Sequence, residues 1–139
     1  MRYVLTVLIA LLSLSALPAY SDESDAVSKA QDSAKAWLAL TDIGKYAESW
    51  DGASALLHAA ITKADWEKAL HSVRAPLGIL KSRKLKSATF TRTLPGVPDG
   101  EYVVIQYDTA FEHKASATET ITPMLEKDGA WRVSGYFIK

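Results

Sequence analysis

The sequence predicts an α+β fold in which N-terminal helices pack on a four-stranded antiparallel meander sheet. Two observations lead to this prediction. Apolar residues recur at helical spacing up to Gly78 and alternate at strand spacing after it. Short, turn-like segments join the strand-like stretches, which makes consecutive strands antiparallel neighbours. The chain has no cysteine, so its stability has to come from the core without disulfides.

The first two helices are read from their caps and breaks. Ser24 and Asp25 are good N-cap residues, so the first helix is expected to begin there. Gly44 marks its end. A second, short helix is predicted to carry Tyr46 and Trp50.

Two further helices complete the helical half. Asp51 is expected to cap the third of the four. The clearest helix is "TKADWEKALHSVRAPLG", where Thr62 occupies the capping position. Pro76 and Gly78 are expected to end it.

The strand half is predicted from four alternating stretches, at residues 84–93, 101–111, 116–125 and 130–139. The face expected to lie under the helices carries Val103, Ile105, Tyr107, Thr109 and Phe111, then Ala115, Ala117, Glu119, Ile121 and Leu125, then Trp131, Val133, Gly135 and Phe137. The face expected to meet water carries Tyr102, Gln106, Asp108, Thr118, Thr120, Arg132 and Tyr136.

The first 21 residues have the pattern of a signal peptide. Arg2 gives a basic start, residues 4–17 are almost entirely apolar, and Ala19-Tyr20-Ser21 has the small-x-small spacing of a cleavage site. An uncleaved anchor is the alternative, but the apolar run is shorter than the ~20 residues of a spanning helix. We therefore expect a signal peptide over residues 1–21 and a single periplasmic or secreted domain over residues 22–139.

The charge balance limits the partners of this domain. The chain has 16 basic and 16 acidic residues, and loss of residues 1–21 removes Arg2 alone, which leaves 15 against 16 and a net charge of −1. Nucleic-acid binding needs a basic footprint that is missing here, so neither nucleic acid nor, after cleavage, a membrane is expected as a partner. A small molecule or a protein stays open as partner, and so does the oligomeric state, a homodimer included.

Glu119 is the most conspicuous candidate site residue, because it falls on the apolar face of its strand. A buried carboxylate is costly unless it is paired or neutral. It could be a cavity carboxylate that acts as a base or holds a ligand. It could be the buried partner of an arginine from the helical half, with Arg74 and Arg83 as the candidates. Third, a bulge could shift the register and leave it in water.

A second candidate cluster combines Asp42, Tyr46, Ser49 and Trp50, which can share one helical side. Such aromatic residues could line the mouth of a ligand site, although more often they pack a helix onto a sheet. Together the two clusters give one candidate set for a ligand site or a structural polar cluster. It comprises Glu119, Arg74, Arg83, Tyr46 and Trp50.

Sequence patterns typical of catalytic and metal sites are missing. His58, His71 and His113 fall in different elements without zinc-ligand spacing. The sequence has no G-x-S-x-G elbow, no glycine-rich phosphate loop, and no Q-x-V-x-G hairpin of a cystatin-type inhibitor. No catalytic residue, metal or cofactor is therefore assigned.

Several stretches together resemble a family of small bacterial exported proteins, domain of unknown function 4019. They are "AWLALTDIGKYAESW", "RAPLGILKSRKLKSA", "LPGVPDGEYVVIQYDTAF", "ETIT" and "DGAWRVSGYFIK". The resemblance runs from about Ala34 to Lys139. It implies a cystatin-like or NTF2-like α+β fold with a curved sheet, and it implies no particular activity.

Two functional hypotheses follow. The first is an exported, soluble, non-enzymatic binding or protein-interaction module. The second is a small cavity enzyme, of isomerase or hydrolase type, that uses Glu119 as its general base.

Overall fold

The computed structural model describes residues 22–139. The predicted signal peptide over residues 1–21 lies outside the described residues. In chain order the elements are α1 (Glu23–Asp42), α2 (Tyr46–Asp51), α3 (Ala55–Ala60), α4 (Lys63–Arg74), the 3₁₀ turn η1 (Ala75–Leu77), β1 (Leu80–Thr91), β2 (Tyr102–Phe111), β3 (Lys114–Leu125) and β4 (Trp131–Ile138). The strands form one antiparallel sheet in the order β1-β2-β3-β4. The predicted α+β meander is confirmed, and the closer likeness to the cystatin or NTF2-like folds stays a prediction.

The first helix begins earlier than predicted, because Asp22 is its N-cap while Ser24 and Asp25 lie inside the helix. The side chain of Asp22, directly before α1, accepts a hydrogen bond from Ser24 N–H at 3.1 Å. Thr62 caps α4 as predicted, with 3.2 Å from its hydroxyl to Asp65 N–H. The predicted cap of α3 is wrong. Asp51 is the last residue of α2, and Ser54 supplies the side-chain cap instead.

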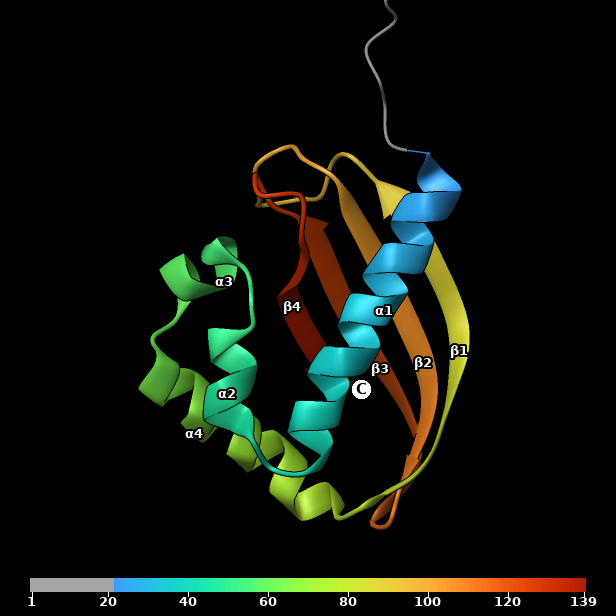
Figure 1. The fold of residues 1–139 in the computed structure, drawn as a ribbon. Helices are drawn as coiled ribbons and strands as arrows, with labels where there is room; N and C mark the ends of the chain where they lie inside the picture. Colours follow the sequence, from blue (N-terminus) through green and yellow to red (C-terminus); the bar gives the residue numbers. More distant parts are fainter. Residues whose placement is uncertain (1–21) are drawn as a thin grey trace, which may run out of the picture.

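The helices lie on one side of a curved sheet (Figure 1). The long helix α1 crosses the sheet, and α2, α3 and α4 form a second group beside β4. Between α1 and the sheet lies the apolar core, which joins Trp37 and Leu38 of α1 to Val103, Ile105 and Ile121 of the sheet. Among residues 22–139, no helix is both long enough and apolar enough to span a membrane.

The register of β4 changes along its length, which corrects the predicted faces. Thr122 pairs with Gly135 but Pro123 pairs with Val133, so one residue of β4 has no partner in β3. After such an extra residue, the side chains of the strand point to the opposite face from the one that simple alternation predicts. Tyr136 therefore packs against the core, although the alternation placed it in water. Phe137, which was expected under the helices, is 52% exposed.

Two other residues expected in water are buried. Tyr102 is 1% exposed because the loop before it folds back over it, and its hydroxyl donates to the Pro98 carbonyl at 2.6 Å. Thr120 is also buried. In the opposite direction, Ala115 lies at the exposed start of β3 although it was expected under the helices.

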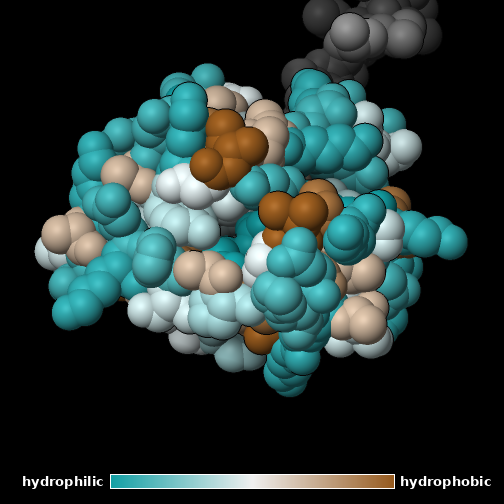
Figure 2. All heavy atoms as spheres, turned by 90° about the horizontal axis from the view of Figure 1, so that it is seen from below, coloured by the Kyte–Doolittle hydropathy of each residue, from teal (hydrophilic) through white to brown (hydrophobic). Residues whose placement is uncertain are grey.

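Apolar side chains are exposed to solvent at the lower end of the molecule in Figure 1. Ile43 follows α1 and is 68% exposed, and Ile79 precedes β1 and is 61% exposed. Seen from below, this end shows separate hydrophobic groups within a largely hydrophilic surface (Figure 2). Exposed apolar residues that are scattered in this way are normal for a folded domain.

Candidate functional site

Glu119 lies on the helix-facing side of β3 and is completely buried. Arg83 of β1 holds it through two hydrogen bonds, Nε to Oε1 at 2.7 Å and Nη2 to Oε2 at 3.1 Å. The hydroxyl of Thr109 donates to Oε1 at 2.6 Å, and the hydroxyl of Tyr136 donates to Oε2. Both carboxylate oxygens are thus occupied by donors. Of the three readings from sequence, the arginine pair describes this geometry, and the reading that placed Glu119 in water is wrong.

Arg83 also joins Glu119 to Asp42, the last residue of α1. Its Nη1 and Nη2 donate to the two oxygens of Asp42 at 2.8 and 2.9 Å. One guanidinium therefore bridges a strand carboxylate and a helix carboxylate, which fixes the end of α1 on the sheet. The planar, forked geometry of arginine suits two carboxylates held in this way better than the point charge of lysine does.

Arg74, at the end of α4, completes the cluster. Its Nη2 donates to Asp42 Oδ1 at 2.8 Å, and its Nη1 donates to Thr41 Oγ1 at 2.8 Å. The side chain is 3% exposed and its guanidinium lies 4.9 Å from the ring centre of Phe111. We call Asp42, Arg74, Arg83, Glu119 and Tyr136 the polar cluster. It contains two positive and two negative groups, so its formal charge balances.

The electrostatics of the polar cluster favour its charged state. Burial alone would raise the pKa of Asp42, but hydrogen bonds and charges from Arg83 and Arg74 outweigh burial and lower that pKa. Burial opposes the charge on Arg83, yet its bonds to Asp42 and Glu119 raise its pKa. Burial and the negative charge of Glu119 raise the pKa of Tyr136, so its hydroxyl stays a donor.

The two aromatic candidates from sequence, Tyr46 and Trp50, do not join the polar cluster. Trp50 packs its ring on His58 at 3.9 Å between ring centres, and its Nε1 donates to the Ile61 carbonyl at 3.0 Å. Tyr46 meets His71 edge to face at 6.0 Å. The neighbouring Ser49 is buried, and its hydroxyl accepts from Trp66 Nε1 at 3.0 Å. The packing interpretation therefore describes Trp50, whereas Tyr46 also lines a surface hollow.

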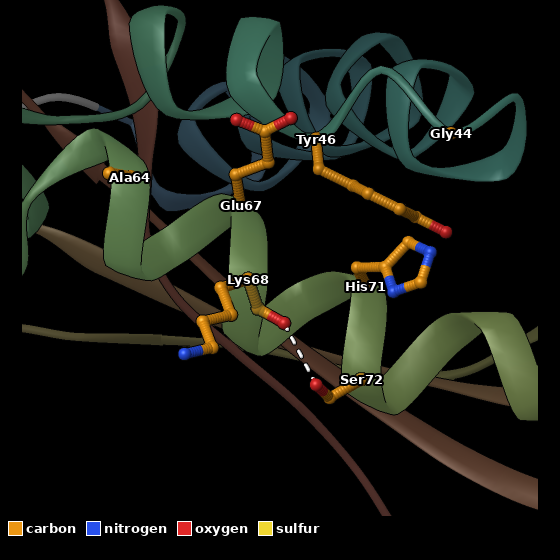
Figure 3. A pocket seen from close by; sticks show the side chains of 7 residues that line it. All are labelled: Gly44, Tyr46, Ala64, Glu67, Lys68, His71 and Ser72. Carbon is orange, nitrogen blue, oxygen red and sulfur yellow. Dashed lines mark hydrogen bonds between the residues drawn. The ribbon is translucent and has the colours of Figure 1, made fainter.

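A surface hollow of about 620 Å³ lies between α4 and the α1–α2 turn, and we call it the α2–α4 groove. It is lined by Gly44, Tyr46, Ala64, Glu67, Lys68, His71 and Ser72. Figure 3 shows the ring of Tyr46 reaching over the imidazole of His71, with Glu67 pointing away from Lys68. The volume is in the range of ligand sites, but the hollow mixes polar and apolar groups and is open to solvent. Within residues 22–139, no group of histidine and acidic side chains is placed to hold a metal ion.

A family model described as "Protein of unknown function (DUF4019)" matches residues 33–136. The chain belongs to this family. The match runs from α1 into β4, so this DUF4019 domain includes all of the polar cluster and the α2–α4 groove. A search of the curated proteins returned no match.

Sequence reasoning named Glu119, Arg74 and Arg83 for the polar cluster but missed three of their partners in this DUF4019 domain. Asp42 was grouped with the aromatic residues next to it in the chain. Thr109 was expected only to face the helices, and Tyr136 was assigned to the opposite face. A signal for Asp42 was available, because two arginines needed acceptors and Glu119 alone could not supply enough of them.

Proposed function

We propose that residues 22–139 of this DUF4019 domain form an exported, non-enzymatic module, periplasmic or secreted, that binds a small molecule or a protein at its surface. The observation that carries the proposal is the state of Glu119. It is fully buried, and Arg83, Thr109 and Tyr136 already donate to both of its oxygens.

This geometry argues against the alternative in which Glu119 is a general base. A base has to come within hydrogen-bond reach of the proton that it takes, directly or through one water. In this structure the hydrogen-bond reach of Glu119 is taken up by Arg83, Thr109 and Tyr136. Through Arg83, the buried carboxylate of Glu119 instead links β3 and β1 to the end of α1.

The surface of the domain offers a hollow in which a ligand can bind. The α2–α4 groove presents an aromatic ring, an imidazole and a pair of opposite charges, Glu67 and Lys68, on two neighbouring helices. Those groups can hold a polar ligand by stacking and by hydrogen bonds. Binding there leaves the polar cluster intact.

Native mass spectrometry of protein purified gently from the exported fraction of a bacterial host tests this proposal. The expected chain begins at Asp22, and we expect an additional mass that stays bound, either a small molecule or a second protein. Ser72→Arg, which fills the α2–α4 groove, tests whether a bound small molecule lies there, and Lys84→Arg on β1 is the matched control. Turnover of any substrate by the wild type, lost in Glu119→Gln, would contradict the proposal.

A further inference from the structure

The two edges of the sheet differ in their protection. β1 carries exposed lysines at Lys81, Lys84 and Lys86, and charged side chains of this kind prevent an edge strand from pairing with other chains. In β4, the segment 134–138 contains no charged residue and no proline. Nothing in the composition of this lower part of β4 opposes the addition of another strand.

The backbone of the lower part of β4 is also free to pair. Lys139 and Thr118 exchange two hydrogen bonds at 2.9 and 3.0 Å, so the backbone groups of Lys139 point toward β3. Because these directions alternate along a strand, the N–H and C=O groups of Tyr136 and Ile138 point away from the sheet. Among residues 22–139, β4 receives one backbone hydrogen bond on its outer edge, from Ser54 N–H to the Val133 carbonyl at 2.9 Å.

An apolar hollow of about 140 Å³ opens beside this free edge, and we call it the α4–β4 groove. Its lining comes from two elements, with Trp66, Ala69, Leu70 and Val73 from α4 and Tyr136 and Phe137 from β4. Val73 is 47% exposed and Phe137 is 52% exposed, so the rim of the hollow is apolar as well. A helix beside a free strand edge, with a hollow between them, is a geometry suited to strand addition.

We propose that the α4–β4 groove binds an extended segment of a partner protein as a fifth, antiparallel strand of the sheet. Backbone hydrogen bonds to Tyr136 and Ile138 hold the segment. A leucine-sized or similar apolar side chain points into the hollow beside α4, and the next side chain points outward along Phe137. This inference rests on the proposed binding function, and it names the surface and the class of partner.

Three features favour a peptide segment over a second copy of the chain. If two copies paired through β4, the side chains on the inward face of the added strand would include Tyr136. That side chain is already bound to Glu119 of its own chain, so it is not available to fill the hollow of the other copy. The free segment 134–138 is only ~17 Å long. Pairing two segments of this length buries far less surface than the ~1,200 Å² at the low end of stable interfaces between proteins. Lys139 lies 6.0 Å from the ring centre of Phe137, so an acidic residue in the segment finds a complementary charge.

The test uses the whole mature chain and a defined probe, the capped peptide acetyl-Glu-Leu-Thr-Leu-Thr-Leu-Thr-amide. Backbone ¹H–¹⁵N NMR spectra are recorded during titration with the probe. We expect saturable shifts centred on the amides of Tyr136 and Ile138, with a Kd at or below about 1 mM. N-methylation of the leucine amides, which face β4, should abolish binding, whereas N-methylation of the threonine amides should leave it unchanged.

Two variants and a control locate the site. Val73→Asp places a charge at the rim, and Ala69→Arg fills the hollow from the exposed side of α4, so each should weaken probe binding at least tenfold. Leu85→Asp changes a residue on β1 that is 50% exposed, nearly the exposure of Phe137, and should leave binding unchanged.

The other outcomes overturn the inference in distinguishable ways. Shifts that centre on Tyr46 and His71 would keep the proposed binding function and reject the α4–β4 groove. The absence of saturable binding up to 5 mM probe, or indifference to N-methylation, rejects strand addition. A stable dimer that shields Tyr136 and Ile138 makes a second copy the occupant. Turnover that depends on Glu119 is what would reject the proposed function itself.

Discussion

The interior of this domain has an apolar part and a polar part, and the two are stabilised differently. In the apolar part, Trp37 of α1 packs against Val103 and Ile121 of the sheet, where many small contacts add up. In the polar part, Arg83 links Glu119 of β3 to Asp42 of α1 through four hydrogen bonds. Apolar packing can lose a methyl group at modest cost, whereas a buried charge pair that loses one partner leaves the other charge uncompensated.

The largest effect is expected from Arg83→Met, which removes the bridge and leaves Glu119 buried without its counter-charge. The free energy of unfolding should fall by about 3–5 kcal/mol. Urea unfolding followed by circular dichroism measures the change. Lys84→Met, one residue further along β1 but exposed, is the matched control and should shift stability by less than about 0.5 kcal/mol.

A double variant sharpens the comparison. Arg83→Met combined with Glu119→Leu removes both charges of the 2.7 Å pair and replaces them with apolar side chains. We expect the loss for the double variant to be smaller than the sum of the two single losses by about 1–3 kcal/mol, because no unpaired charge stays in the interior at β3. Additive losses would mean that Arg83 and Glu119 act independently.

The outline of the fold could be predicted from sequence because it depends on local patterns. Thr62 caps α4 through its own neighbours, and Gly44, with φ of 79°, ends α1 in a conformation that favours glycine. The faces of β4 could not be predicted, because the change of register at Thr122 is set by pairing with another strand. Asp42 finds Arg83 at a separation of 41 residues, which no local pattern encodes.

Tyr136→Phe removes one donor to Glu119 and keeps the ring that packs edge to face on Trp37. The free energy of unfolding should fall by about 1.5–3 kcal/mol at neutral pH. The raised pKa of Tyr136 has a second consequence. Its contribution is fully present below the unfolded tyrosine pKa of ~10 and is lost as the pH rises above that value. Unfolding curves from pH 7 to 11 should therefore be flatter for the variant than for the wild type.

Asp42 is expected to cause part of the decrease in the free energy of unfolding at acidic pH. Its folded pKa is lowered, so its contribution is present above the unfolded value of ~3.9 and is lost as the pH falls through the folded pKa. Asp42→Asn should flatten the loss of stability between pH 5 and pH 2. Asp25→Asn, at an exposed position of α1, is the surface control for the same chemical change.

The smallest effect is expected in the apolar part. Ile121→Val removes one methylene at a site with no exposed surface, and the free energy of unfolding should fall by about 0.5–1.5 kcal/mol. The change should be independent of pH, unlike those at Asp42 and Tyr136. A loss as large as that of Arg83→Met would erase the distinction between the two parts.

Urea unfolding of Glu119→Gln at pH 7 tests the central claim most directly. If Glu119 is a structural anchor, the neutral amide weakens its bonds with Arg83, Thr109 and Tyr136, and stability should fall by about 2–3 kcal/mol. A carboxylate that is kept in the interior for chemistry or ligand binding destabilises the folded state, so replacing it with a neutral group stabilises the fold. Unchanged or increased stability of Glu119→Gln would therefore contradict the structural account.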